Sequence, residues 1–167
     1  MSKKQKKDPF VIVLILSYNG KHLLDEAIQS YLCNSYNNSR IVVIDNGSID
    51  GTENYVKDRY QEVEVIRVNT NVGYSGGFNI GLDYAFNKNN ADYVLITNND
   101  VKADTELISS LVKVAVTDKK IGFTIGKVYF YENKNMLQSV GKKHSDRYWS
   151  NGHIGDREID RGQFDTI

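Results

Sequence analysis

The sequence predicts an α/β fold built on a mostly parallel sheet flanked by helices. Apolar runs at 10–16, 41–44 and 93–96 show no polar alternation, which is typical of strands covered on both faces, as in parallel sheets. Stretches with helical periodicity separate these runs, so we expect successive βαβ units with right-handed crossovers. With 167 residues, the chain is long enough for one domain with a substantial core.

The first predicted strand, Phe10–Leu16, ends in the polar residues 17–20. A helix should follow, because apolar residues recur there at helical spacing. Its predicted buried stripe consists of Leu23, Leu24, Ala27, Ile28, Tyr31 and Leu32. Cys33 falls in the same pattern, and we interpret it as a buried thiol and not as a nucleophile.

The second predicted strand is Arg40–Ile44, and polar residues again follow it, at 45–48. Asp50 is a candidate N-cap for the next helix, with Glu53 three residues later as its capping-box partner. The third predicted strand, Val63–Val68, shows more polar alternation, which predicts a position nearer the edge of the sheet.

A glycine-rich connection at 69–81 comes next and opens a helix that carries Leu82, Ala85 and Phe86. The fourth strand begins at Tyr93, and we expect it to be covered on both faces. Beyond it the pattern predicts a helix with Leu107, Ile108, Leu111, Val112 and Ala115, a β segment over 121–131, a turn at 133–135 and a short strand over 137–140.

The chain divides into three expected parts. Residues 1–9 form a basic, disordered N-terminus, residues 10–141 form the folded domain, and residues 142–167 form a loop-rich segment without a periodic apolar stripe. The basic cluster at 3–7 is interpreted as solvated, with weak contact to a membrane surface or a phosphate as the alternative.

Composition excludes several classes of protein. Twenty-one basic and 21 acidic residues give a net charge of zero, so there is no global field to recruit nucleic acid. The single cysteine excludes an internal disulfide framework and fits a reducing compartment. No apolar run reaches membrane-spanning length and no signal peptide is evident. We therefore expect a location in the cytoplasm or at the inner face of the membrane.

Short polar side chains follow three of the predicted strands. In a parallel sheet the ends of these strands lie at one edge, where open α/β sheets bind ligands. A single polar strand end is mostly turn chemistry, but three of them together, with a glycine-rich connection between the second and third, favour a binding site. The candidate residues are Ser17, Tyr18, Asn19, Asp45, Asn46, Gly73, Gly76, Gly77, Asn79, Asn98, Asn99 and Asp100.

The chemistry of these residues fits a nucleotide. Tyr18 offers a flat side chain to a base, and the Asp45 carboxylate can accept a hydrogen bond from a pyrimidine N3–H. A diphosphate needs either a P-loop or a divalent metal. The P-loop and the Gly-x-Gly-x-x-Gly signatures are both absent from the sequence, so Asp100 is the candidate ligand for Mg²⁺ or Mn²⁺.

Other catalytic and metal signatures are missing. His22, His144 and His153 have no second His or Cys at zinc-ligand spacing. Ser17 has no base evident in the sequence, and there is no Gly-x-Ser-x-Gly elbow.

Four segments, Val13–Gly20, Val43–Thr52, Asn71–Gly81 and Thr97–Val101, resemble the inverting family 2 glycosyltransferases with the GT-A fold, a Rossmann-like architecture. The four motifs occur in the family's order, the resemblance spans about 10–140, and it is closest to the rhamnosyltransferase-like branch. It implies metal-dependent transfer of a sugar from dTDP-rhamnose or a UDP-sugar to a glycan or lipid-linked acceptor, in cell-surface polysaccharide synthesis.

The resemblance also implies roles for individual residues. Ser17, Tyr18 and Asp45 would hold the base, and Asn99 would lie near the ribose. Asp100 would bind the metal on the diphosphate, and residues 73–79 would pack against the donor. Asn98 departs from the Asp-x-Asp pattern of the wider family and removes one negative charge near the metal.

Family members use a carboxylate general base that follows the metal-binding strand. Nothing after Val140 matches its motif, so we hypothesise that this chain is the donor-binding part of a longer enzyme and that its base lies beyond Ile167. The alternative is a binding module that holds a nucleotide sugar without chemistry. A sugar nucleotidyltransferase is disfavoured, because residues 17–20 are not the glycine-rich, basic signature of that class.

Overall fold

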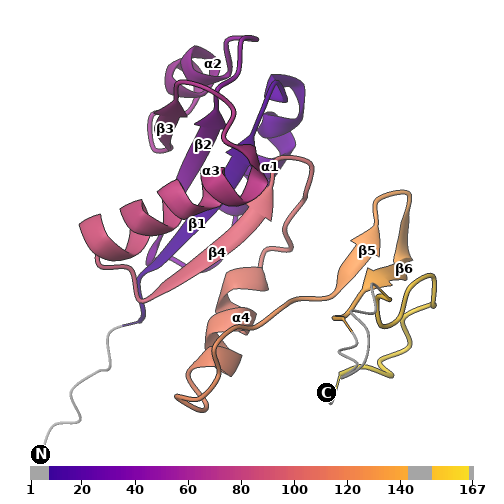
Figure 1. The fold of residues 1–167 in the computed structure, drawn as a ribbon. Coiled ribbons are helices and arrows are strands. Elements are labelled where there is room, and N and C mark those ends of the chain that lie inside the picture. Colours follow the sequence, from indigo (N-terminus) through magenta and orange to yellow (C-terminus); the bar gives the residue numbers. More distant parts are fainter. Residues whose placement is uncertain (1–7, 143–151, 166–167) are drawn as a thin grey trace, which may run out of the picture. The chain divides into compact units, whose positions relative to one another are not determined.

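The computed structural model describes residues 8–142 and 152–165 (Figure 1). Its internal contacts divide the chain into two compact units, residues 1–110 and residues 111–167, which we call the first and second units. The division falls inside helix α4, Leu107–Ala115. The boundary expected at 141/142 stays a prediction.

The first unit contains a four-stranded parallel sheet in the order β3-β2-β1-β4. Its strands are β1 Val11–Ser17, β2 Ser39–Asn46, β3 Glu64–Val68 and β4 Tyr93–Asn98. All residues of β1 are buried, as expected for a central strand between two layers of helices. The predicted α/β class and the edge position of β3 are confirmed.

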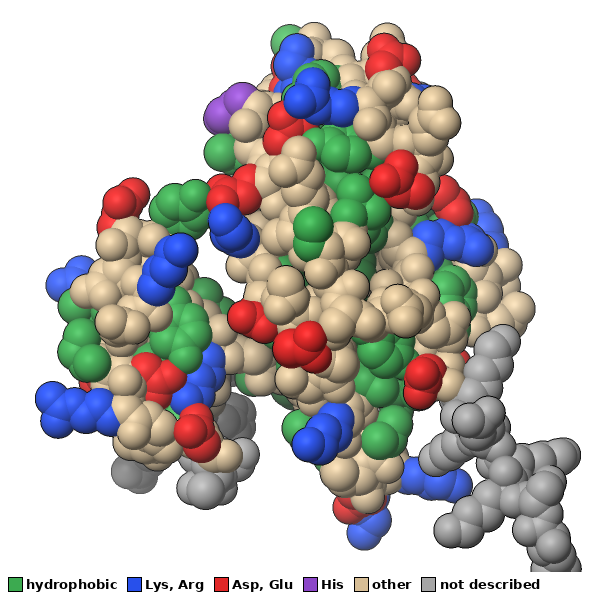
Figure 2. Space-filling model, turned by 180° about the vertical axis from the view of Figure 1, so that it is seen from behind, with side chains coloured by type: hydrophobic (Ala, Val, Ile, Leu, Met, Phe, Trp, Pro, Cys, Tyr) green, Lys and Arg blue, Asp and Glu red, His purple; other side chains and the backbone are tan. Residues whose placement is uncertain are grey.

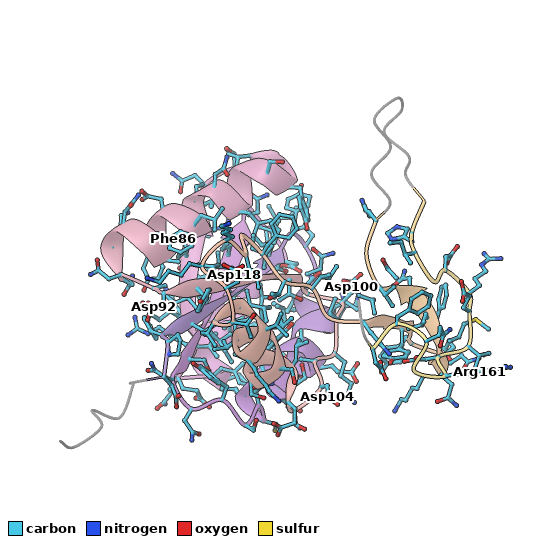
Figure 3. All side chains as sticks on the ribbon, turned by 90° about the horizontal axis from the view of Figure 1, so that it is seen from below. Phe86, Asp92, Asp100, Asp104, Asp118 and Arg161 are labelled. Carbon is cyan, nitrogen blue, oxygen red and sulfur yellow. The ribbon has the colours of Figure 1, made fainter. Side chains whose placement is uncertain are left out.

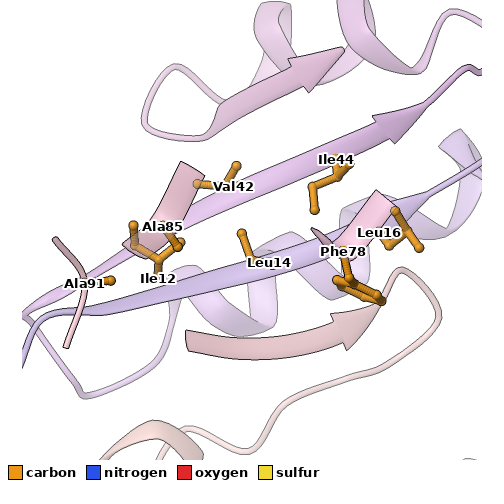
Figure 4. Packing of buried hydrophobic residues seen from close by; sticks show 8 residues of the cluster. All are labelled: Ile12, Leu14, Leu16, Val42, Ile44, Phe78, Ala85 and Ala91. Atoms are coloured by element: carbon orange, nitrogen blue, oxygen red, sulfur yellow. The ribbon is translucent and has the colours of Figure 1, made fainter. Parts of the chain in front are cut away.

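Helices cover both faces of this sheet (Figure 1). They are the 3₁₀ turn η1 Lys21–Leu23, α1 Leu24–Leu32, α2 Thr52–Arg59, α3 Gly73–Leu82 and the π-helical turn η2 Asp83–Lys88. Even-numbered residues of β1 and β2 share a core cluster with Phe78 and Ala85 of the α3–η2 segment (Figure 4). Their alternation places the odd-numbered residues on the opposite face.

The buried face of α1 is narrower than predicted. Leu24, Ala27, Ile28 and Tyr31 are buried, but Leu23 and Leu32 are 39% and 37% exposed. The predicted buried thiol is wrong: Cys33 is exposed and terminates α1. The reason is that the helix ends at Leu32, so Cys33 leaves the buried stripe.

The capping box predicted at Asp50 and Glu53 does not form. Gly51, at φ +81°, occupies the N-cap position of α2, so Asp50 lies one residue too early for a box. Asp50 Oδ1 still accepts hydrogen bonds from Thr52 N–H at 3.1 Å and from Thr52 Oγ1 at 2.6 Å. Glu53 instead pairs with Lys57 at 2.7 Å, one helical turn on.

The glycine-rich connection is mostly helix, because α3 begins at Gly73. Two of its glycines face the sheet and allow close packing. A Cβ at Gly77 would lie 2.6 Å from Leu16 Cδ1, and one at Gly81 would lie 2.4 Å from Ile44 Cδ1. These glycines therefore set the distance between α3 and the central strands.

The prediction that β4 is covered on both faces is wrong. The strand lies at the edge of the sheet, opposite β3. Ile96 is 47% exposed, and residues 93–95 are only partly buried. An apolar run without alternation therefore did not distinguish a central strand from an edge strand here.

The second unit holds an antiparallel pair, β5 Val128–Phe130 and β6 Asn133–Ser139. Residues 121–127 have no regular structure, so the predicted β segment is shorter than expected. The turn is at 131–132, and 133–135 already belong to β6. Residues 152–165 lie against β6, through backbone bonds such as Leu137 N–H to Glu158 O at 2.8 Å.

Substitution of Gly81 tests the close packing of α3. Gly81→Val should lower the free energy of unfolding by about 1–3 kcal/mol, because the added atoms would overlap Ile44 and Leu14. Urea denaturation measures this change. Ile80→Val, at a neighbouring position that is 38% exposed, is the matched control and should change stability by less than about 0.5 kcal/mol. Equal effects at the two positions would contradict the packing role of Gly81.

Candidate functional site

A row of polar side chains crosses the sheet at the carboxyl ends of its strands. The strand register aligns Ser17 with Asp45, Asp45 with Arg67, and Leu16 with Asn98. Ser17 and Asp45 are 1% and 0% exposed, so this edge is polar although it is buried. The structure thus brings together the three strand ends that the sequence singled out.

Asp45 is held by an ion pair and a backbone hydrogen bond. Arg67 Nη1 lies 2.5 Å from Asp45 Oδ2, and Ser48 N–H donates to Asp45 Oδ1 at 3.0 Å. Arg67 Nη2 also donates to the Ser48 carbonyl at 2.7 Å. Because the Arg67 side chain remains 31% exposed, the pair lies at the boundary between the core and solvent.

The loops that follow β1 and β2 are joined to each other. Asn19 N–H donates to Ser48 Oγ at 3.0 Å, and Ile49 N–H donates back to Asn19 Oδ1 at 2.9 Å. Lys21 N–H reaches Asp50 Oδ2 at 3.1 Å. Asn19 adopts φ +50°, a left-handed conformation that asparagine tolerates better than most residues. These reciprocal bonds make one continuous wall from the two loops.

Asn46 connects β2 to the start of α3. Its Nδ2 donates to Asn71 Oδ1 at 3.0 Å and to the Gly73 carbonyl at 3.1 Å. Its Oδ1 accepts from Val72 N–H at 3.2 Å. Asn46 is only 2% exposed, and its three hydrogen bonds hold the start of the glycine-rich segment against the end of β2. The role of Asn46 is therefore structural.

The end of β4 is anchored by Asn99. Its Nδ2 donates to Ser17 Oγ at 3.1 Å and to the Gly20 carbonyl at 3.3 Å. Asn98 and Asp100 on either side are exposed, and Figure 3 shows Asp100 in the segment that leaves β4. The Asp100 carboxylate makes no hydrogen bond or ion pair with the residues that the structure describes.

Aromatic rings and the remaining α3 residues complete the edge. Tyr18 is 51% exposed and Tyr74, in the first turn of α3, is 61% exposed. The Tyr74 ring packs edge-to-face on the buried Phe78 at 4.9 Å between centroids. Gly76 and Gly77 are turned toward Val72 and the sheet, whereas Asn79 is exposed. Of these residues, the two tyrosines offer apolar surface to a ligand.

A hard divalent cation fits the donor chemistry of this edge. Asp100 offers one exposed carboxylate with free oxygen lone pairs, which suits Mg²⁺ or Mn²⁺ when phosphate oxygens and water supply the other ligands. No group of three or more His, Cys, Asp or Glu side chains that could hold a metal occurs within residues 8–142 and 152–165. An all-protein metal cage is therefore not what these residues provide.

Arg67 was missed by sequence reasoning. A signal was available, since Arg67 is a charged residue between the apolar Ile66 and Val68 of β3, and a parallel register could have aligned it with Asp45. Among the late carboxylates, Asp160 is engaged elsewhere. Hydrogen bonds from Tyr129 and Lys127 lower the pKa of Asp160 to about 2, which makes it a weak base. His144 lies outside the described residues.

These observations define an α/β protein whose polar side chains gather at the carboxyl edge of a parallel sheet, the edge at which open α/β sheets bind ligands. The sequence profile described as Glycosyl transferase family 2 matches residues 12–164. The chain belongs to this family.

Curated relatives are described as glycosyltransferases. Two uncharacterized glycosyltransferases of Haemophilus influenzae are 32% identical over 77 residues and 30% identical over 95 residues. The matches cover 44% and 55% of this chain but only 24% and 36% of those proteins. The chain thus spans about a third or less of the relatives it matches.

Solved structures confirm the GT-A fold. One of them is the mannosyltransferase PcManGT from Pyrobaculum calidifontis in complex with GDP-Man and Mn²⁺, with a TM-score of 0.64 at 22% sequence identity. The match covers 73% of this chain and 36% of the PcManGT chain. TarS from S. aureus, residues 1–349 in complex with UDP-GlcNAc, has a TM-score of 0.56 at 20% identity, covering 64% and 31% of the two chains. At these identities the similarity concerns the fold.

The surface agrees with the balanced composition. On the face shown in Figure 2, basic and acidic side chains are interspersed with hydrophobic ones. Among the helices that the structure describes, none has the length and apolar character needed to cross a bilayer.

Removal of Arg67 tests the ion pair that holds Asp45. Arg67→Met should lower the free energy of unfolding by roughly 3 kcal/mol, because it leaves a buried carboxylate unpaired. Arg59→Met is the matched control: Arg59 pairs with Asp25 at 3.4 Å but is 56% exposed, so its loss should cost less than about 1 kcal/mol. In urea denaturation, equal losses for both variants would contradict a structural role of the Asp45–Arg67 pair.

Proposed function

We propose that this chain forms the donor-binding part of an inverting glycosyltransferase that uses a nucleoside-diphosphate sugar. The observation that carries the proposal is the polar row at one sheet edge. There the Asp45–Arg67 pair and the exposed Asp100 carboxylate, which has no partner among the described residues, belong to the same unit. In such a transfer an acceptor hydroxyl oxygen attacks the anomeric carbon. The bond to the diphosphate breaks, and the diphosphate leaves with the electron pair.

Asp45 and Arg67 support recognition of a pyrimidine. The Asp45 carboxylate accepts hydrogen bonds, and the adjacent Arg67 guanidinium donates them. This acceptor–donor pair complements the N3–H and carbonyl groups of uracil or thymine. Ser17 lies opposite Asp45 in the strand register, and the exposed Tyr18 follows it, so we assign Ser17, Tyr18 and Asp45 to the base, with Arg67 added.

The remaining residues are assigned along the path of the donor. Asn99 lies near the ribose, and Asp100 holds Mg²⁺ or Mn²⁺. A cation held there supplies positive charge that stabilises the leaving diphosphate. Asn19, Asn46, Gly73, Gly76, Gly77, Asn79 and Asn98 form the surrounding walls, and the hydrogen bonds of Asn46 and the close contacts of Gly77 support a structural contribution.

The general base is assigned to a part of the enzyme outside this chain. Of the carboxylates after Val140, Asp160 is held ionised by Lys127 and Tyr129 at a pKa of about 2, far below the range that suits a base at neutral pH. The same donor site without a base would be a nucleotide-sugar-binding module, and an assay of sugar transfer separates the two.

The finer identity of the reaction is also a proposal. By resemblance we propose a hexosyltransferase of the rhamnosyltransferase-like branch that uses dTDP-rhamnose or a UDP-sugar and acts on a glycan or lipid-linked acceptor in cell-surface polysaccharide synthesis. Its proposed location is the cytoplasm or the inner face of the membrane. PcManGT was solved with GDP-Man and Mn²⁺ and TarS with UDP-GlcNAc, which supports a nucleotide-sugar donor and a divalent metal here.

Asp100→Ala should abolish the metal-dependent part of nucleotide-diphosphate binding, because it removes the protein's carboxylate ligand. Calorimetric titration with uridine or thymidine diphosphate, with Mn²⁺ and with a chelator, measures this. Asp58→Ala, which removes an exposed carboxylate from α2, is the matched control and should bind normally. Unchanged Mn²⁺-dependent binding by the Asp100 variant would refute the metal assignment.

Asp45→Asn should weaken uridine binding about tenfold or more, since a charge-assisted hydrogen bond contributes roughly 1.5–3 kcal/mol. Pyrophosphate binding with Mn²⁺ should stay unchanged, because it does not involve the base. Circular dichroism confirms that the variant is folded before titration. Equal losses for uridine and pyrophosphate would show that Asp45 is structural.

A further inference from the structure

Asn99, Ser17 and Gly20 form a small hydrogen-bonded group that joins the end of β4 to the loop after β1. Both hydrogens of the Asn99 amide are used, one on Ser17 Oγ at 3.1 Å and one on the Gly20 carbonyl at 3.3 Å. Ser17 is 1% exposed and Gly20 is buried. We call this group the amide lock. Both its acceptors belong to the wall that flanks the predicted base pocket.

The amide lock requires a residue without a side chain at position 20. A Cβ at Gly20 would lie 2.1 Å from Asn99 Nδ2 and 3.3 Å from Ser17 Oγ, and a contact of 2.1 Å is far inside van der Waals distance. The backbone does not demand glycine, because Gly20 has φ −119°, which any residue adopts. The close approach of Asn99 is therefore the constraint on position 20.

The next residue after Asn99 is the carboxylate assigned to the metal. The Asp100 side chain has no partner among the described residues, so its own contacts do not fix its position. Asn99 supplies fixed contacts one residue away, and these contacts connect the Asp100 turn to the base-binding loop. A ligand carboxylate held by surrounding hydrogen bonds binds its metal more tightly than a loose one.

We propose that Gly20 and Asn99 are positioning residues that couple the Asp100 metal site to the base pocket through the amide lock. This inference rests on the proposed function and goes beyond it, because it assigns a role to a glycine that touches neither base nor metal. It also gives the Asn99 amide nitrogen a task inside the protein, which leaves Oδ1 as the atom that can accept from a ribose hydroxyl.

The test is Gly20→Ala in the full chain. The added methyl should displace the Asn99 amide, which is the far end of a side chain and can move. The variant should therefore fold, with a lower midpoint in urea because both hydrogen bonds of the amide are lost. Its affinity for uridine or thymidine diphosphate with Mn²⁺ should fall about 10- to 100-fold, the usual effect of losing a support of a metal ligand. Its affinity for the nucleoside alone should fall less, because the metal ligand does not take part in binding a nucleoside.

A double-mutant cycle separates this role from general damage to the loop. Asn99→Ala should weaken Mn²⁺-dependent binding, and Gly20→Ala added to it should cause no further loss, because the glycine acts through Asn99. Gly122→Ala is the matched control, since a Cβ there meets no atom within 4 Å, and it should bind like the unaltered chain.

Several results would overturn the inference. Normal Mn²⁺-dependent binding by Gly20→Ala would do so, as would additive losses in the double variant or an equal loss of nucleoside affinity. The Asp100→Ala variant distinguishes the two levels of failure. If Asp100→Ala loses metal dependence and Gly20→Ala keeps it, only the amide lock is wrong. If the unaltered chain binds neither nucleotide diphosphate, the proposed function fails as well.

Discussion

A carboxylate without access to solvent stands at the end of β2, and the surrounding loops are arranged to make that burial tolerable. An unpaired buried charge would cost several kcal/mol, so Asp45 is paired with Arg67 from the neighbouring strand and with Ser48 N–H from the loop that follows. Ser48 Oγ in turn receives Asn19 N–H from the loop after β1. Satisfying one carboxylate thereby sets the geometry of both loops before any ligand arrives.

The central layer of the fold could be predicted from the sequence, because burial on both faces requires the unbroken apolar runs at 11–16 of β1 and 41–44 of β2. The edge position of β4 could not be predicted in this way. Its residues are apolar like those of a central strand, yet Ile96 is about half exposed. The glycine-rich segment was expected to open a helix, and α3 does begin within it, at Gly73. Gly77 and Gly81 serve close helix–sheet packing, which depends on contacts distant in sequence.

The candidate site could likewise be predicted only in part. Polar residues after three strands could be brought to one edge by topology alone, and the structure does bring Ser17, Asp45 and Asn99 there. Their partners could not be foreseen, because hydrogen bonds such as Asn46 to Gly73 or Asn99 to Gly20 follow from loop conformations. The pairing of Arg67 with Asp45 could have been predicted, but only by considering strand register together with charge.

The exposed thiol at the end of α1 has a practical consequence. Cys33 is the sole cysteine of the chain, and α1 carries it back from the carboxyl ends of the strands toward the start of β2. A fluorophore or spin label attached through its sulfur would therefore modify one defined position, remote from the strand ends that bear Ser17 and Asp45. In air the same thiol is the one atom through which two copies could become covalently joined, so preparations for spectroscopy need a reductant until labelling.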